Sequence, residues 1–304
     1  MKNIILILII ATSLFSCEKT VNIKIPDNGR KLTVNSFFSK DSNLVVSLSK
    51  SRYILDGTYN FESVEDADIS FFENNNLVEN LNEVNPGIYK SNFILQENNN
   101  YRIEVSSKDF PVVNCQSSIP GKTEIISLSV NPSADEYGNQ TVTFKLKFQD
   151  DLGSTNYYFI QVFRRVKYTY YDEDSGTEIT NENIEMVYID SDDPNVFQED
   201  WALTDGLLMS GELINGREYT LSFASSSGYY YEGQNESSNE DDTTYFIYFH
   251  SVSKDYYLYY KSLSKHRETK DEFFMEPVQV YNNIENGFGI FAGYSTVVDS
   301  VKVE

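Results

Sequence analysis

The residues best suited to chemistry are acidic side chains that gather in one short stretch of the chain. Carboxylate oxygens are the ligands that calcium prefers, so this stretch could hold a calcium ion. It lacks the residue order of an EF-hand loop and has no glycine at the turning position. We therefore favour a solvated acidic loop and keep calcium as the alternative. The acidic residues are Asp190, Asp192, Asp193, Glu199 and Asp200.

Catalysis by an activated serine or cysteine needs a histidine base, and the chain has two histidines. His250 follows an apolar stretch and is typical of a core or edge residue, whereas His266 lies between two basic residues. The sequence contains no Gly-x-Ser-x-Gly elbow, no Walker loop and no zinc-ligand spacing. We expect a non-catalytic protein. The enzymatic alternative is a carboxylate pair of the glycosidase type, which the sequence does not locate.

Three consecutive tyrosines form a second candidate site. Tyr229, Tyr230 and Tyr231 lie in the polar stretch from Ser225 to Thr244, which we expect to be a long exposed loop. Exposed tyrosines bring a large contact area with few rotatable bonds, so they make efficient contacts with a ligand or partner. Local packing beneath the loop is the alternative, and we weigh the two equally.

The N-terminus has the pattern of an export signal. An apolar run from Ile4 to Ala11 follows a lysine and is shorter than the roughly 18 residues that span a bilayer. We therefore predict a signal peptide over residues 1–16 that is removed from the mature protein. The stretch Leu14-Phe15-Ser16-Cys17 resembles the bacterial lipoprotein box, in which the cysteine is acylated and becomes the mature N-terminus. Residues 17–29 then form a lipidated tether. An ordinary signal peptide with an incidental cysteine is the alternative.

Composition narrows the classes of partner. The formal net charge of −22 and a pI near 4.4 oppose binding to nucleic acid or to anionic lipid surfaces. The chain has two cysteines, Cys17 and Cys115, so acylation of the first leaves no disulfide partner for the second. We expect Cys115 to be a buried small residue rather than a reactive thiol. The 23 tyrosines and 20 phenylalanines favour half-buried strands and binding surfaces.

Short runs of alternating apolar and polar residues fill the first half of the mature chain. Turn residues separate them about every 8 to 12 positions, a spacing typical of a small β-sandwich. We predict an N-terminal β-sandwich over residues 30–120, and its texture resembles the transthyretin-like or carboxypeptidase-regulatory type. The expected strands cover residues 32–38, 44–48, 67–72, 77–84, 88–95, 101–105 and 111–119.

The second half begins at Pro120-Gly121-Lys122, where the last of these strands ends. We expect residues 121–304 to form a larger antiparallel β domain with one helix, so the fold class is mainly β with two sandwich-like domains. The helix is expected over residues 253–267, because Ser253 can cap it and apolar residues recur on one face. The expected strands are 142–148, 157–166, 184–189, 216–223 and 245–249, the first two joined as a hairpin.

The segment from Glu276 to Ser295 reads EPVQVYNNIENGFGIFAGYS. It is similar to the C-terminal signature of a Bacteroidota lipoprotein family described only as domain of unknown function 4249. The lipoprotein start, the strand from Lys31 to Asn35 and the tyrosine-rich helix fall in the family's order, so the resemblance covers nearly the whole mature chain. We expect the signature to be a strand followed by a turn. Its glycines permit positive φ or close backbone packing, and they are Gly287, Gly289 and Gly293.

This resemblance implies an outer-membrane lipoprotein that is often encoded beside a TonB-dependent transporter and has no established reaction. Glu18 and Lys19 are similar to the charged signals that send such lipoproteins to the cell surface. We therefore expect a surface-exposed, non-catalytic partner of a transporter that captures a solute or covers the transporter's mouth. A structural or adaptor lipoprotein in an outer-membrane secretion or assembly complex is the alternative. The ligand is not indicated, and calcium is the one cofactor under consideration.

Overall fold

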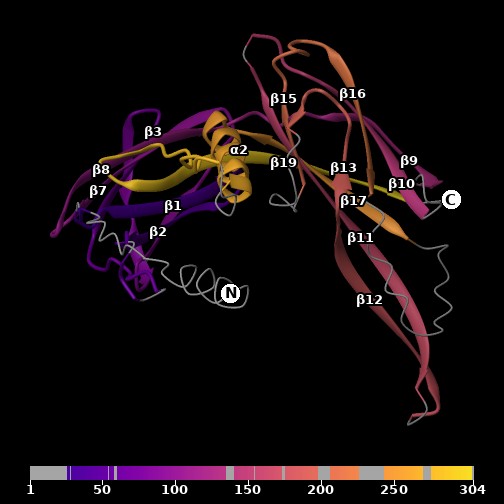
Figure 1. Cartoon of the computed structure of the whole chain (residues 1–304), viewed down its shortest axis with the longest axis horizontal. Coiled ribbons are helices and arrows are strands. Elements are labelled where there is room, and N and C mark those ends of the chain that lie inside the picture. The colour runs from indigo at the N-terminus through magenta and orange to yellow at the C-terminus, as the bar shows by residue number, and fades with distance from the viewer. Residues whose placement is uncertain are drawn as a thin grey trace, which may run out of the picture.

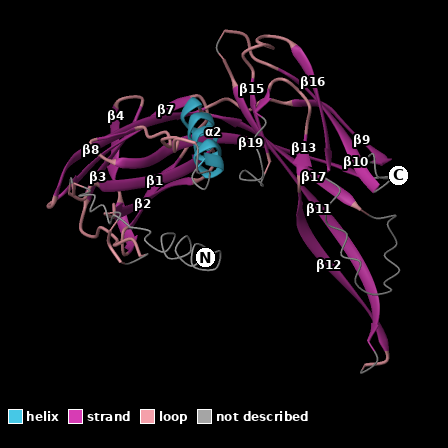
Figure 2. Cartoon of the chain, in the orientation of Figure 1, coloured by secondary structure: helices cyan, strands magenta, loops and turns pink. Residues whose placement is uncertain are grey.

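A computed structural model describes residues 26–27, 29–53, 55–57, 60–134, 140–153, 155–172, 175–197, 206–225, 243–269 and 275–302. Within these residues the chain forms nineteen strands and one helix. Figure 2 shows that strands make up most of the fold. The prediction of a mainly β protein is confirmed. The described part contains no helix that is both long and apolar enough to cross a membrane.

The largest sheet has ten strands and runs through both halves of the molecule (Figure 1). Its order is β14-β15-β11-β17-β19-β1-β2-β6-β5, and β12 pairs with β11 beside this path. The strands are β1 (Leu32–Ser39), β2 (Asn43–Lys50), β5 (Asn82–Asn85), β6 (Ile88–Ile94), β11 (Tyr157–Asp172), β12 (Thr177–Val187), β14 (Val196–Phe197), β15 (Leu207–Ser210), β17 (Thr244–Val252) and β19 (Phe288–Lys302).

Two smaller sheets pack on it. The five-stranded sheet, in the order β18-β8-β7-β3-β4, belongs to the N-terminal half, and the four-stranded sheet, in the order β13-β16-β10-β9, belongs to the C-terminal half. The strands are β3 (Asp68–Glu73), β4 (Asn76–Asn80), β7 (Asn99–Ser107), β8 (Phe110–Ile119), β18 (Ile284–Glu285), β9 (Ile125–Ala134), β10 (Gln140–Gln149), β13 (Ile189–Asp190) and β16 (Glu218–Ser225).

Both small sheets cover the same face of the large one. Phe291 of β19 lies in the N-terminal core, and Val301 of the same strand packs on the C-terminal core. The two residues are separated by an even number of positions, so their side chains point to one face. The result is two sandwiches side by side that share a single long sheet. The expected sandwich-like arrangement is confirmed.

The helix α2 (Lys254–Thr269) packs on the opposite face, and the helix prediction is confirmed. The Ser253 hydroxyl accepts a hydrogen bond from the Tyr256 amide at 3.3 Å, as expected of a capping residue. Tyr256 and Tyr257 are buried in a third core against Ala292 of β19. The helix therefore covers the sheet where the two sandwiches meet.

β19 is the strand that joins the halves. It pairs in parallel with β1 over Phe288 to Tyr294 and antiparallel with β17 over Tyr294 to Lys302. A Cβ on Gly289 would lie 1.9 Å from the Val34 carbonyl oxygen, and one on Gly293 would lie 2.4 Å from the Ser118 oxygen. These signature glycines therefore lie in a strand that leaves no room for a side chain. The segment forms the short strand β18, then a turn at Asn286-Gly287, as expected, and then the long strand β19, which the sequence analysis did not predict.

The domain boundary at Pro120 stays a prediction, but the core beside it is shared with the C-terminal segment. The core of residues 30–120 contains Ile284 and Phe291 from the C-terminal segment. Phe291 lies against Phe38 of β1, with 4.5 Å between the ring centroids. A fragment that ends at Pro120 would therefore expose part of its own core.

The expected hairpin between residues 142–148 and 157–166 is wrong. β10 pairs with β9 and β16, whereas β11 belongs to the large sheet. The connection crosses from one layer to the other and is held by Asp150, which is 1% exposed. Its carboxylate accepts hydrogen bonds from the Tyr158 hydroxyl at 2.5 Å and from the Gly216 amide at 3.0 Å. Alternation in the sequence shows which side chains share a face, but it does not select the partner strand.

Candidate functional site

A two-stranded ribbon projects from the C-terminal half (Figure 1). β11 pairs with β17 only as far as Arg165, but it continues to pair with β12 as far as Asp172. We call residues 166–172 and 177–183 the arm. No other described strand pairs with it. A ribbon of two strands is marginally stable in water, and its open edges can accept a further strand. The arm is therefore a candidate protein interface.

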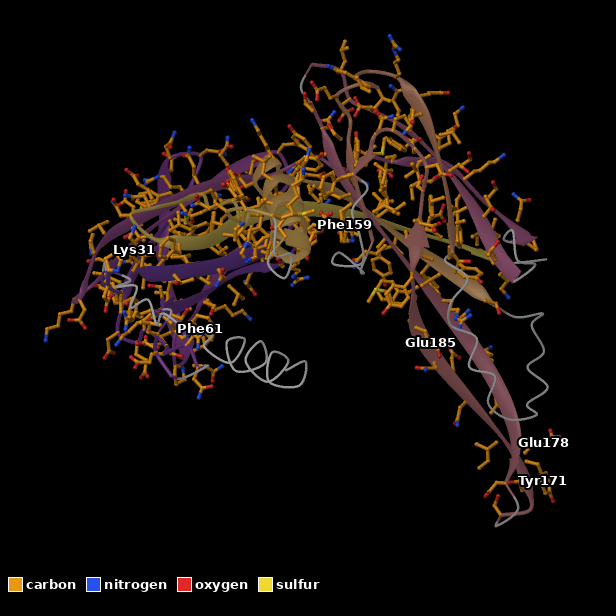
Figure 3. The ribbon with its side chains drawn as sticks, in the orientation of Figure 1. Lys31, Phe61, Phe159, Tyr171, Glu178 and Glu185 are labelled. Carbon is orange, nitrogen blue, oxygen red and sulfur yellow. The ribbon has the colours of Figure 1, made fainter. Side chains whose placement is uncertain are left out.

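Two large side chains on one face of the ribbon are exposed, with polar and charged residues between them. Tyr171 lies near the tip of the arm (Figure 3). Tyr171 and Ile184, at the base, are each 62% exposed, and the register places them on the same face. The ion pair between Arg165 and Glu182, at 3.6 Å, lies beside them. Exposed pairs of this kind contribute roughly 0 to 1 kcal/mol, so they add little rigidity. The open edges of the ribbon, together with these two exposed side chains, make the arm a candidate contact surface for a partner.

A second candidate site is an open cavity of about 750 Å³, which we call the amide pocket. Its walls come from the turn between β3 and β4, from β7 and β8, from the start of α2 and from the signature segment. All ten lining residues are polar: four asparagines, one glutamine, two serines, one lysine, one aspartate and one tyrosine. Segments far apart in the sequence thus meet in one polar site.

The floor of the amide pocket is a fixed network. The Asp255 carboxylate accepts hydrogen bonds from the Ser117 hydroxyl at 2.6 Å and from the Tyr281 hydroxyl at 2.8 Å. Burial and the bond to Asp255 raise the pKa of the Tyr281 phenol, so this group remains a donor. Asn283 donates to the Phe291 carbonyl at 2.7 Å and accepts from its amide at 3.0 Å, which ties the signature segment to β19.

The polar side chains at the rim of the amide pocket differ from those of its floor, because they have no bonding partner within the described structure. Within the described residues, the side chains of Asn100, Gln116, Ser118 and Lys254 make no hydrogen bond or ion pair. Asn100 and Gln116 are exposed, and each lies on a strand whose backbone is fixed in the five-stranded sheet. The lining of the pocket therefore combines bonded side chains with exposed side chains that are free to bind a ligand.

The profile of one protein family, Domain of unknown function (DUF4249), matches residues 18–300. The chain belongs to this family. No curated protein matches the sequence. The arm and the amide pocket both lie inside the matched DUF4249 region, and the signature segment contributes Tyr281 and Asn283 to the pocket.

Several residues predicted from the sequence lie outside the described part of this DUF4249 chain. Acylation and surface export therefore stay predictions, as does a contact through the tyrosine triplet. The residues concerned are Cys17, Glu18, Lys19, Glu199, Asp200, Tyr229, Tyr230 and Tyr231.

The described part of the acidic stretch is tied into its own loop. Asp193 accepts hydrogen bonds from the Asn195 amide at 2.9 Å and from the Tyr219 hydroxyl at 2.5 Å. Burial and Asp193 raise the pKa of Tyr219 to about 12, and burial and Asp192 raise the pKa of Asp190. Within the described residues no three acidic, histidine or cysteine side chains converge on a metal position. Calcium stays a prediction, since two of its five candidate ligands lie outside these residues.

Both histidines lie within hydrogen-bonding distance of neighbouring residues. His250 is 9% exposed, and its ring nitrogens lie 2.8 Å from the Thr296 hydroxyl and 3.2 Å from the Gln161 side-chain oxygen. Burial lowers the pKa of His250 to about 4, so the ring is neutral at pH 7. His266 donates to the Val278 carbonyl at 2.7 Å. Cys115 is buried, as expected, and burial raises the pKa of its thiol.

The sequence analysis missed both the arm and the amide pocket. The strands predicted over 157–166 and 184–189 cover only part of β11 and β12, and the sequence analysis missed residues 167–172 and 177–183. In residues 167–171 tyrosines alternate with Lys167 and Thr169, which was a usable signal. No pattern in the sequence indicated the amide pocket. Asn100, Gln116 and Asp255 form no motif, and only the fold brings them together.

Proposed function

We propose that this protein is a surface-exposed outer-membrane lipoprotein that acts as a non-catalytic accessory partner of a TonB-dependent transporter. The arm is the observation that carries the proposal, because a weakly supported ribbon with open edges and exposed apolar side chains suits contact with another protein. The lipid anchor rests on Cys17 and its preceding residues. The choice of a transporter as partner rests on the family resemblance.

The layout of the chain supports this role. Lys31, near the start of the described chain, and Tyr171, on the arm, lie in opposite halves of the molecule (Figure 3). An anchor at Cys17 would therefore hold one half near the membrane while the arm reaches a neighbouring protein. Capture of a solute for the transporter, or cover for its mouth, would both use this geometry.

A structural or adaptor lipoprotein in an outer-membrane secretion or assembly complex is the second candidate. The exposed face of the large sheet favours it, because Val298 and Met186 extend the apolar surface beyond the arm. Permanent assemblies bury more apolar area than transient ones, so exposed apolar side chains outside the arm suit this alternative.

The test is affinity capture from native membranes, followed by mass spectrometry. We compare the wild type with a Tyr171→Ser, Ile184→Ser double variant. The control is Leu213→Ser, which removes a side chain that is 70% exposed and lies between β15 and β16. We expect the wild type and the control to capture a β-barrel transporter. The double variant should retain at most about a tenth as much, since hot-spot side chains contribute roughly 2 kcal/mol or more.

Each result has a separate meaning. Wild-type capture without any β-barrel transporter would contradict the proposed partner, and capture of assembly proteins in its place would favour the adaptor. Equal capture by the double variant would show that the arm is not the contact.

Cys17→Ala should move the protein from the membrane fraction to the soluble fraction. Protease added to intact cells should digest the wild type if it faces outward.

A further inference from the structure

We propose that the amide pocket binds a neutral polyhydroxylated ligand of the oligosaccharide class. The observation that points to it is a cavity of about 750 Å³ lined entirely by polar side chains, five of them primary amides. This volume falls within the roughly 300 to 1,000 Å³ of small-molecule sites. The pocket and the arm lie in different sheets, so this inference does not depend on the proposed transporter.

The lining matches the hydrogen-bonding pattern of sugar hydroxyls. A primary amide presents two donors and one acceptor oxygen side by side, and a hydroxyl both donates and accepts. Neighbouring hydroxyls on a sugar can therefore each find a partner on the same amide. Asn100 and Gln116 offer this pattern without breaking any bond of the described structure, and Ser118, which lies opposite Asn100 in the strand register, adds a hydroxyl.

The charges of the pocket select a neutral ligand. Lys254 and Asp255 are its two ionic side chains, and their formal charges cancel. An anion would meet Asp255 and the field of a chain with net charge −22, whereas a cation, which that field attracts, would meet the ammonium group of Lys254 within the pocket. A neutral ligand is repelled by neither side chain, and it can still accept a hydrogen bond from the lysine.

The structure disfavours a peptide in the same place. Peptides bind by adding a strand to a free edge or by placing apolar side chains in grooves. β7 is paired on both edges, with β3 and with β8, and the Gln116 carbonyl of β8 accepts a hydrogen bond from Asn283. No aliphatic side chain lines the pocket. Recognition must therefore go through side-chain amides and hydroxyls.

The floor of the amide pocket is ordered before a ligand binds, and this helps a ligand that makes only weak contacts. Ser117 and Tyr281 both donate to Asp255, so the three segments that meet there are already in place before a ligand arrives. Less order has to be gained on binding, which reduces the entropic cost of association. The free side chains of the rim then provide the specific contacts.

The experiment screens the full mature chain against an array of neutral oligosaccharides, an array of acidic oligosaccharides and a peptide array. The strongest oligosaccharide is then titrated by calorimetry into the wild type and into an Asn100→Ala, Gln116→Ala double variant. Asn82→Ala is the matched control, because it removes an exposed amide on β5, outside the pocket. We expect neutral oligosaccharides to bind and the double variant to lose about tenfold in affinity. The control should bind as the wild type does.

Thermal unfolding checks that the double variant is folded, and Ser118→Ala provides a second variant with a smaller expected loss. The inference is overturned if the neutral array gives no binding, if only acidic sugars or peptides bind, or if the double variant binds as tightly as the control. Capture of a transporter should be the same for these variants and the wild type, so a failure here is distinct from a failure of the proposed partnership.

Discussion

Protonation of His250 should destabilise the folded chain in mild acid. The ring is 9% exposed, and burial lowers its pKa to about 4. An unfolded histidine titrates near pH 6.5, so the unfolded chain binds more protons than the folded chain between pH 6.5 and pH 4. The stabilisation is therefore fully present above pH 6.5 and is lost as the pH falls toward 4.

The magnitude follows from the two pKa values. The difference between about 6.5 and about 4 corresponds to about 3 kcal/mol at pH 4, at about 1.4 kcal/mol per pKa unit. The neighbours of the ring in the described structure are uncharged, so no nearby carboxylate offsets this loss. They are Phe159, Tyr248, Tyr294, Thr296 and Gln161.

The assay is urea unfolding followed by far-ultraviolet circular dichroism at several pH values between 7 and 4. The comparison variant is His250→Gln, which keeps a polar side chain near Thr296 and does not titrate in this range. Between pH 7 and pH 4, the free energy of unfolding of the wild type should fall by about 3 kcal/mol more than that of the variant. Parallel pH profiles for the two proteins would refute the assignment of this loss to His250.

Three further predictions concern contacts that join strands and layers of the fold. Gly293→Ala should prevent normal folding, since a Cβ there would meet the Ser118 carbonyl oxygen at 2.4 Å, and loss of soluble protein on expression measures it. Asp150→Ala should lower the free energy of unfolding by about 3 kcal/mol in urea denaturation, because it leaves the buried Tyr158 hydroxyl without its carboxylate partner. Residues 30–120 alone should lack a cooperative thermal transition and should gain one when residues 276–302 are fused to them, because those residues supply β18 and β19.

The sequence by itself determined the local elements of this protein. The seven strands expected between residues 32 and 119 correspond to β1 through β8, with the fourth divided into β4 and β5, because period-two alternation is a property of neighbouring residues. The helix could also be predicted, because capping by Ser253 and the spacing of the tyrosines are local properties of the sequence. The family could be identified from the signature segment.

The tertiary structure alone decided which strands pair and which side chains meet. Alternation assigns a residue to a face, so it could not show that β10 and β11 belong to different sheets or that β19 would lie parallel to β1. The amide pocket depends on those choices, because Gln116, Asp255 and Tyr281 come together only after β19 has joined the two sandwiches. A site built by long-range pairing leaves no local pattern in the sequence, and for this reason it appears only in the fold.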